Sequence, residues 1–187
     1  GDSFREHGEP THGMLLYDST LRVPLILSCP GLLPQERVLS GQLVGLVDLA
    51  PTLRSLFALE AVPCDGVDLL RAGADPHRAV YLETLAPYHF AGWSPLHGLR
   101  TLAAKYVEGP NPEFYDLERD PGEARNLLSE SPSEAARLRA LLAAMTAEWS
   151  GAPSTARALT DEERERLASL GYIQMEGQGA AGGRADP

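Results

Sequence analysis

The sequence predicts an α/β protein that ends in a small antiparallel sheet followed by helices. An apolar run that ends at a Pro-Gly pair predicts a buried strand, and a helical pattern comes after it. A series of short strand-like runs follows, and a long amphipathic pattern comes last. Strands gathered after an α/β segment are typical of a separate small sheet. In order, these segments are 21–29, 47–59, 79–83, 99–107, 113–117 and 132–149.

Boundary residues define the first strand and helix. Residues 1–20 are polar and contain glycine, which indicates a loop ahead of the strand. Pro24 lies inside the apolar run and argues for an edge or a bulge at that point. In the helix over 47–59, Asp48 is the expected N-cap and Pro51 falls within the first turn.

Spacing and capping signals define the C-terminal helices. Over 132–149, apolar residues recur at helical spacing and predict one buried face. A second helix is expected to start at Thr160, because Thr160 and Glu163 fit a capping box, and to end at Gly171. Residues 174–187 are rich in Gly and Ala and are expected to be disordered. The apolar face of the first helix consists of Ala135, Leu138, Leu141, Leu142, Met145 and Trp149.

Composition excludes several classes of protein. With 43% apolar residues, a chain of 187 residues can bury a sizeable core. A net charge of −10 argues against nucleic acid as a partner and gives no reason for attraction to anionic lipid. No apolar run reaches the roughly 18 residues of a membrane span. Cys29 and Cys64 are too few for a disulfide framework or a cysteine metal site, and no leader defines the compartment.

Titratable side chains crowd into the loop ahead of the first strand. Glu6, His7, Glu9 and His12 lie within seven residues. Imidazole and carboxylate groups suit a divalent metal ion, and histidine also suits general acid–base catalysis near neutral pH. A hydrogen-bonded surface loop explains the same residues. The five-residue step between the two histidines does not match a zinc-binding helix.

This cluster opens a series of short motifs that runs in order over about residues 1–173. The motifs include Glu6-His7-Gly8, Pro10-Thr11-His12-Gly13, Leu16-Tyr17-Asp18, Leu21-Arg22-Val23-Pro24-Leu25-Ile26, Val47-Asp48-Leu49-Ala50-Pro51-Thr52-Leu53, Asp65-Gly66-Val67-Asp68-Leu69, Gly92-Trp93-Ser94, Phe114-Tyr115-Asp116-Leu117 and Leu167-Ala168-Ser169-Leu170-Gly171-Tyr172-Ile173. Each motif is weak alone, but the ordered set resembles the sulfatase family, within the alkaline-phosphatase-like superfamily.

The resemblance implies the C-terminal part of an alkaline-phosphatase-like sandwich. The chain would then open in the middle of a catalytic domain, and a downstream repeat domain could follow it. The implied parts are the end of the catalytic α/β domain over 1–70, a small antiparallel subdomain over 78–128, a helical tail over 129–173 and the disordered segment 174–187.

The resemblance also implies two cofactors, a formylglycine nucleophile and a calcium ion. In the family the nucleophile derives from a cysteine or serine in a Cys-x-Pro-x-Arg setting, which Cys29 and Cys64 both lack. The calcium-binding Asp-His or Asp-Asn pair stands just before a dipeptide that Gly1-Asp2 resembles. Nucleophile and most metal ligands would therefore lie upstream, no metal ligand is assigned here, and the chain is expected to be inactive alone.

Three residues are the candidates for the active site. His12 stands where relatives often carry a lysine that contacts the sulfate, so it could donate to the sulfate oxygens or protonate the leaving group. A structural loop histidine is the alternative. His89 and Trp93 follow the strand 79–83 and could face a substrate ring, or else belong to an aromatic cluster that closes the small sheet.

The function implied is hydrolysis of a small-molecule or glycan sulfate ester, by the full-length protein. A phosphodiesterase or another phosphoryl-transfer member of the same superfamily is the nearest alternative. A non-catalytic interaction module, built on the amphipathic helix over 132–149, is the alternative of a different class. The compartment stays open, a periplasmic or extracellular one included.

Overall fold

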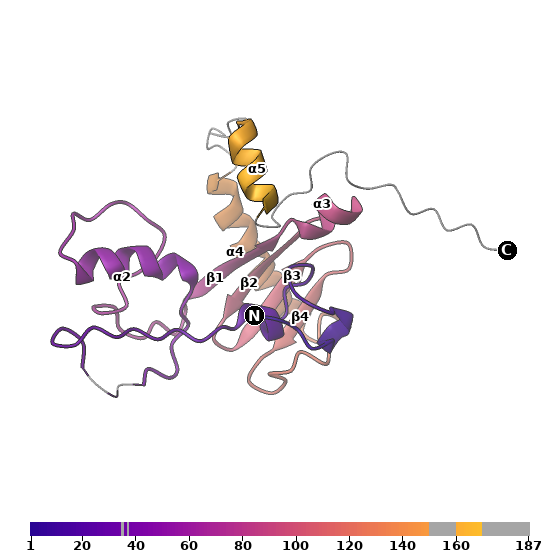
Figure 1. The fold of residues 1–187 in the computed structure, drawn as a ribbon. Helices are drawn as coiled ribbons and strands as arrows, with labels where there is room; N and C mark the ends of the chain where they lie inside the picture. The colour runs from indigo at the N-terminus through magenta and orange to yellow at the C-terminus, as the bar shows by residue number, and fades with distance from the viewer. Residues whose placement is uncertain (35, 37, 150–159, 170–187) are drawn as a thin grey trace. The chain divides into compact units, whose positions relative to one another are not determined.

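A four-stranded antiparallel sheet, in the order β1-β2-β3-β4, lies at the centre of residues 1–149 (Figure 1). The computed structural model describes residues 1–34, 36, 38–149 and 160–169. The strands are β1 (Ala79–Thr84), β2 (Leu96–Thr101), β3 (Ala104–Glu108) and β4 (Glu113–Asp116).

The strand register aligns large side chains in one row across the sheet. Leu99 of β2 is paired with Tyr81 of β1 and with Tyr106 of β3, and Tyr106 is paired in turn with Phe114 of β4. Side chains directly opposite one another lie on the same face of a sheet. Leu99 is fully buried, and Tyr106 and Phe114 are nearly so, which makes this row one side of the core.

Helix α4 (Pro132–Trp149) packs against this row, as its amphipathic pattern predicted. Ala135, Leu138 and Leu142 are buried in the same apolar cluster because their spacing of three and four residues places them on one stripe. Leu141 was also expected on this stripe, but it is 36% exposed. Its position is one residue, or about 100°, away from Leu142 around the helix, which turns it toward solvent.

The strands predicted at the start and end of the sheet are confirmed, whereas the run 99–107 is two strands rather than one. A tight turn separates β2 from β3. The Thr101 hydroxyl closes this turn by accepting a hydrogen bond from the backbone N–H of Ala104 at 3.0 Å. Apolar content continues through the turn, so hydrophobicity alone did not reveal it.

A short helix, α3 (Ala86–Ala91), follows β1 in a segment for which the sequence analysis predicted no helix. Its start and end carry ordinary helix signals. Pro87 stands in the first turn, where its missing N–H costs nothing, and Gly92 follows the helix in the left-handed conformation (φ 64°).

The run 21–29, predicted to be a buried strand, is neither buried nor a strand. The short helix α1 (Asp18–Leu21) takes up its start, and residues 22–29 have no regular secondary structure. Leu25 is 45% exposed and Ile26 is 85% exposed. A strand needs a neighbouring backbone for its hydrogen bonds. In the part of the chain that the structure describes, the sheet holds only β1 to β4, and none of them pairs with this run.

The helix predicted over 47–59 is present as a 3-10 turn, η2 (Leu46–Asp48), followed by α2 (Leu49–Leu56). Asp48 stands at the N-terminal end of α2 as predicted. Its carboxylate makes no capping bond to that helix and is used elsewhere, as described below.

Helix α5 (Asp161–Ser169) begins with the predicted capping box. The Thr160 hydroxyl accepts from the backbone N–H of Glu163 at 3.3 Å, and the Glu163 carboxylate accepts from the backbone N–H of Thr160 at 2.9 Å. None of the helices described is both long and apolar enough to cross a membrane. Three predictions fall outside the described residues, namely those for the side chain of Trp149, for Gly171 and for 174–187.

A buried lysine connects the sheet to the N-terminal loop. Lys105 of β3 is fully buried, and its Nζ lies 2.5 Å from the Asp18 carboxylate and 2.6 Å from the Glu123 carboxylate. It also donates to the carbonyl oxygen of Leu16 at 3.0 Å, and Arg100 pairs with Asp18 at 2.9 Å. A buried charge is costly unless it is paired, so these contacts hold three distant segments together.

The same network sets the titration of Asp18. Burial by itself would raise the pKa of this carboxyl, but the hydrogen bond from Arg100 and the charge of Lys105 outweigh burial and hold the pKa below its usual range. A group of this kind stabilises the folded state above its unfolded pKa. The stabilisation is lost as the pH falls through the lower pKa of the folded state.

Replacing Lys105 with methionine should destabilise the fold, because the variant leaves Asp18 and Glu123 without their buried cation. We expect a loss of about 3–5 kcal/mol in the free energy of unfolding, measured by urea denaturation of the full-length protein near neutral pH. As the pH falls below about 4, the wild type should lose stability. The variant should lose less, because the pKa of Asp18 is lowered less.

Arg119→Met is the matched control for this experiment. The Arg119 side chain is 89% exposed and pairs with Asp116 of the same turn at 3.6 Å. Its removal should change the free energy of unfolding by less than about 0.5 kcal/mol. Equal losses in the two variants would contradict the role of the buried network.

Candidate functional site

The N-terminal loop, residues 1–17, is held in shape by its own polar groups. The backbone N–H of Ser3 donates to the carbonyl oxygen of Thr11 at 2.7 Å and closes the loop. The Glu9 carboxylate, only 3% exposed, accepts from the backbone N–H of Met14 at 2.7 Å. The segment that carries His12 is therefore tied on both sides by hydrogen bonds within the loop.

One threonine ties this loop to the end of β1. The Thr84 hydroxyl donates to the carbonyl oxygen of Gly13 and accepts from the backbone N–H of Ala86 at 3.2 Å. Ala86 is the first residue of α3. A single side chain thus contacts both the loop next to His12 and the start of the helix that carries His89.

The four titratable residues of the loop do not converge on one point. The Glu6 carboxylate accepts hydrogen bonds from backbone N–H groups close by in the sequence. The N–H of Glu6 itself and then that of Phe4 hold the pKa of this carboxyl below its usual range. His7 stacks on Tyr17 with the ring centroids 3.7 Å apart, so its ring packs within the loop. Among the described residues, no three side chains of His, Cys, Asp and Glu gather as a metal site.

His12 is an exposed imidazole of this loop, and its side-chain partner is Asp2. The His12 Nδ1 atom lies 2.5 Å from the Asp2 Oδ1 atom. The two side chains are 68% and 67% exposed. An imidazole in such a place can donate a hydrogen bond to an anion or transfer a proton. Sequence reasoning missed Asp2, because a separation of ten positions gives no periodic signal and only the closed loop brings the partners together.

His89 and Trp93 lie on and just after α3, and both are exposed. Trp93 is 66% exposed and Phe90 is 83% exposed, so these rings do not form a buried cluster that closes the sheet. Tyr88, also on α3, lies edge-on against His89 with the ring centroids 5.4 Å apart. Within the described part of the chain, no hydrogen bond or ring contact joins His12 to His89 or Trp93.

Two of the recognised motifs pack together through Asp48. The fully buried Asp48 carboxylate accepts from the backbone N–H of Gly45 at 2.8 Å and of Val67 at 2.9 Å, and it pairs with Arg78. Gly66 fits only because it lacks a side chain, since a Cβ there would lie 2.0 Å from the carbonyl oxygen of a facing residue. Both motifs therefore have a structural role.

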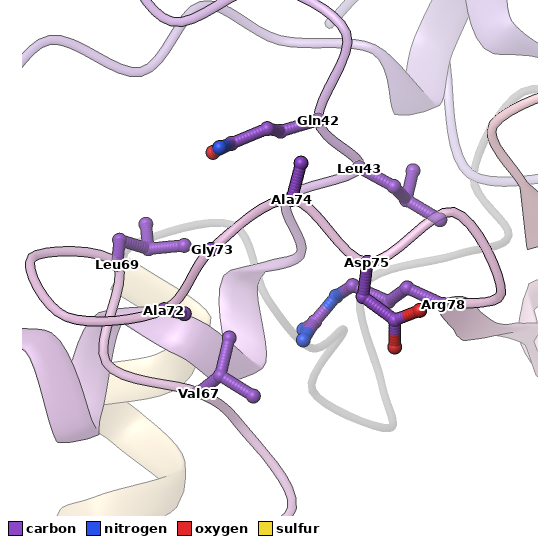
Figure 2. Close-up of a pocket in the computed structure, with 9 residues that line it drawn as sticks. All are labelled: Gln42, Leu43, Val67, Leu69, Ala72, Gly73, Ala74, Asp75 and Arg78. Atoms are coloured by element: carbon purple, nitrogen blue, oxygen red, sulfur yellow. The ribbon is translucent and has the colours of Figure 1, made fainter.

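A cavity of about 90 Å³ lies beside this contact (Figure 2). None of the three predicted site residues lines it. Beside the Asp48 pair, the Arg78 Nε atom is buried without a partner among the described residues, which is compatible with a bound water. The lining residues are Gln42, Leu43, Val67, Leu69, Ala72, Gly73, Ala74, Asp75 and Arg78.

Comparison with known proteins identifies the family, although no protein-family model matches the chain. The chain is 30% identical over 141 residues to a Delta 4,5-hexuronate-2-O-sulfatase of Bacteroides thetaiotaomicron, a match that covers 68% of this chain. It is also 30% identical over 149 residues to arylsulfatase K of Mus musculus, covering 71% of this chain. The solved structure of a 2-O GAG sulfatase superposes on 81% of the chain with a TM-score of 0.66 and 27% identity.

The chain belongs to the sulfatase family. The resemblance inferred from the ordered motifs is thereby confirmed, as is the α/β class with a small antiparallel sheet. The sulfatase chain spans about a quarter of the length of the two curated relatives, 28% and 26%, and 35% of the solved structure.

Glu9→Ala should loosen the sulfatase segment that carries His12, because the Met14 N–H loses its buried acceptor. A buried N–H without a partner costs about 1–3 kcal/mol. We therefore expect the amide hydrogen of Met14 to exchange about tenfold faster or more in the full-length protein. Glu9→Gln keeps an oxygen acceptor and should retain most of the protection. Equal exchange rates in the wild type and both variants would show that this bond does not hold the loop.

Proposed function

We propose that the full-length protein hydrolyses sulfate esters and that His12 contacts the reacting sulfate. The observation that carries this proposal is the placement of His12. It is an exposed imidazole on a loop that Glu9, Thr11 and Gly13 tie down, at the position where sulfatases often carry a lysine. A side chain held by its surroundings can act on a substrate without first being ordered.

The chemistry required of His12 follows from the charge of the reaction. As the bond between sulfur and the leaving oxygen breaks, negative charge grows on the sulfate oxygens and on that leaving oxygen. A positioned N–H donor stabilises this charge, and a proton donor can neutralise it. Imidazole can serve either purpose near neutral pH.

Formylglycine and calcium, the cofactors expected from the family resemblance, do not fit the described residues of this chain. Cys29 and Cys64 are free thiols outside the sequence setting of the nucleophile. The described residues contain no cluster of three or more metal-ligating side chains. We therefore assign both groups to other residues of the full-length protein, and we propose that this chain alone is inactive.

We propose that the substrate is a glycan or small-molecule sulfate ester that contacts His89 and Trp93. The names of two proteins similar to this chain refer to sugars. They are a hexuronate 2-O-sulfatase and a 2-O GAG sulfatase. The exposed face of Trp93 offers an apolar platform on which a sugar or aryl ring can stack. Thr84 places the start of α3 next to the loop of His12, which supports a shared site.

Exchanging His12 for alanine in the full-length protein should lower kcat/KM for a sulfate ester by about 10²–10⁴-fold, the usual contribution of a general acid. Steady-state hydrolysis of a panel of sulfated sugars and aryl sulfates measures this effect. His77→Ala removes another exposed imidazole and should leave the rate within about twofold. A wild-type protein that hydrolyses phosphate monoesters or diesters instead would favour the phosphoryl-transfer alternative.

Trp93→Ala should raise KM by about tenfold while kcat changes little, because stacking binds the substrate and its transition state alike. Phe57→Ala is the matched control, since Phe57 is an equally exposed aromatic (64%) at the end of α2. An unchanged KM in the Trp93 variant, across sugar and aryl substrates, would remove this residue from the proposed site.

A further inference from the structure

We propose that Asp2 is a positioning residue for His12. It holds the imidazole through Nδ1, so that Nε2 is the nitrogen that donates a proton to the leaving oxygen of the sulfate ester. This inference rests on the proposed function. It goes further by assigning a role to each ring nitrogen and by adding a residue to the reaction.

The contact between the two side chains fixes which nitrogen is engaged. His12 Nδ1 lies 2.5 Å from the Asp2 carboxylate. An ionised carboxylate can only accept a hydrogen bond, so the proton between the two groups lies on Nδ1. In the described residues nothing hydrogen-bonds Nε2. A carboxylate that accepts from one ring nitrogen sets the orientation of the ring and leaves the other nitrogen for chemistry.

The backbone, and not only the side chains, brings the pair together. The hydrogen bond from the Ser3 N–H to the Thr11 carbonyl joins the neighbours of Asp2 and His12, which places these two residues opposite one another. On the far side of His12, the Gly13 carbonyl accepts from Thr84. The position of the imidazole is thus set by contacts on both sides.

Asp2 is the carboxylate of this loop that is available to accept a hydrogen bond from His12. Glu6 accepts hydrogen bonds within its own turn, and Glu9 is buried against the Met14 N–H. Asp18 is engaged by Lys105 and Arg100. The exposure of His12, 68%, leaves its free nitrogen accessible to a bound ester.

The proton that His12 gives to the leaving oxygen is replaced from water in each turnover. In the reacting imidazolium both ring nitrogens carry a proton. The bond between sulfur and the leaving oxygen breaks, its electron pair stays on that oxygen, and the proton of His12 Nε2 moves onto it to give the alcohol. Over the complete hydrolysis, water supplies the oxygen that ends on sulfur and one of its protons returns to Nε2. Asp2 keeps its hydrogen bond to Nδ1 throughout and does not itself transfer a proton.

Asp2→Asn, made in the full-length protein, tests the inference. The amide can donate to Nδ1 only when that nitrogen carries no proton, which opposes the imidazolium, so kcat for a sugar sulfate should fall about 10–100-fold with KM within about twofold. Asp2→Glu restores the carboxylate and should recover most of kcat. In protein labelled with ¹⁵N-histidine, the His12 shifts should show a proton on Nδ1 in the wild type and its loss in Asp2→Asn.

Two controls separate positioning from a structural role. Asp65→Asn makes the same chemical change at another exposed carboxyl and should leave kcat unchanged. In a double variant with His12→Gln, Asp2→Asn should cost nothing further, because its effect passes through His12. Additive losses in the double variant, or a single Asp2→Asn variant with wild-type kcat and an unchanged Nδ1 proton, would overturn the inference. A wild-type protein that hydrolyses no sulfate ester overturns the proposed function instead.

Discussion

The buried Lys105 cation holds together the parts of the chain on which the proposed site depends. Its ammonium group contacts Asp18 and Glu123 and the carbonyl oxygen of Leu16, so it joins β3, the N-terminal loop and the loop after β4. A lysine without water is stable only when such partners surround it. The apolar core under α4 orders the sheet, but charge pairing attaches the loop that carries His12 to that sheet.

This attachment explains how an exposed histidine can be well placed. The loop is fixed at Leu16 by Lys105, at Gly13 by Thr84 and at Met14 by Glu9. Each fixed point is a hydrogen bond that involves backbone, whereas the imidazole itself stays in water. Rigid support beneath an accessible reactive group is what a site needs when the substrate is charged and must shed its water on binding.

Local patterns could predict the elements, but not the contacts that position the site. The helix over 132–149 and the strands predicted over 79–83 and 113–117, which are β1 and β4, followed from periodicity and turn residues. The prediction of a buried strand over 21–29 was wrong, because apolar content does not say whether a partner strand lies beside a segment. The ion pair of Lys105 with Asp18 spans more than eighty residues and leaves no trace in local sequence. The family resemblance pointed to His12 but not to its carboxylate partner.

Thr84 joins the loop that carries His12 to the start of helix α3. Its hydroxyl contacts the carbonyl next to His12 and the first N–H of α3, so one side chain joins the loop to the start of the helix that bears His89. Pro87 and Gly92 fix the two ends of that helix, and the exposed ring of Trp93 follows directly. If sulfate is held by His12 and the rest of the substrate by the aromatic residues, then their spacing is set by one threonine at the end of β1. Selectivity for the substrate and placement of the reacting group would then depend on the same hydrogen bonds.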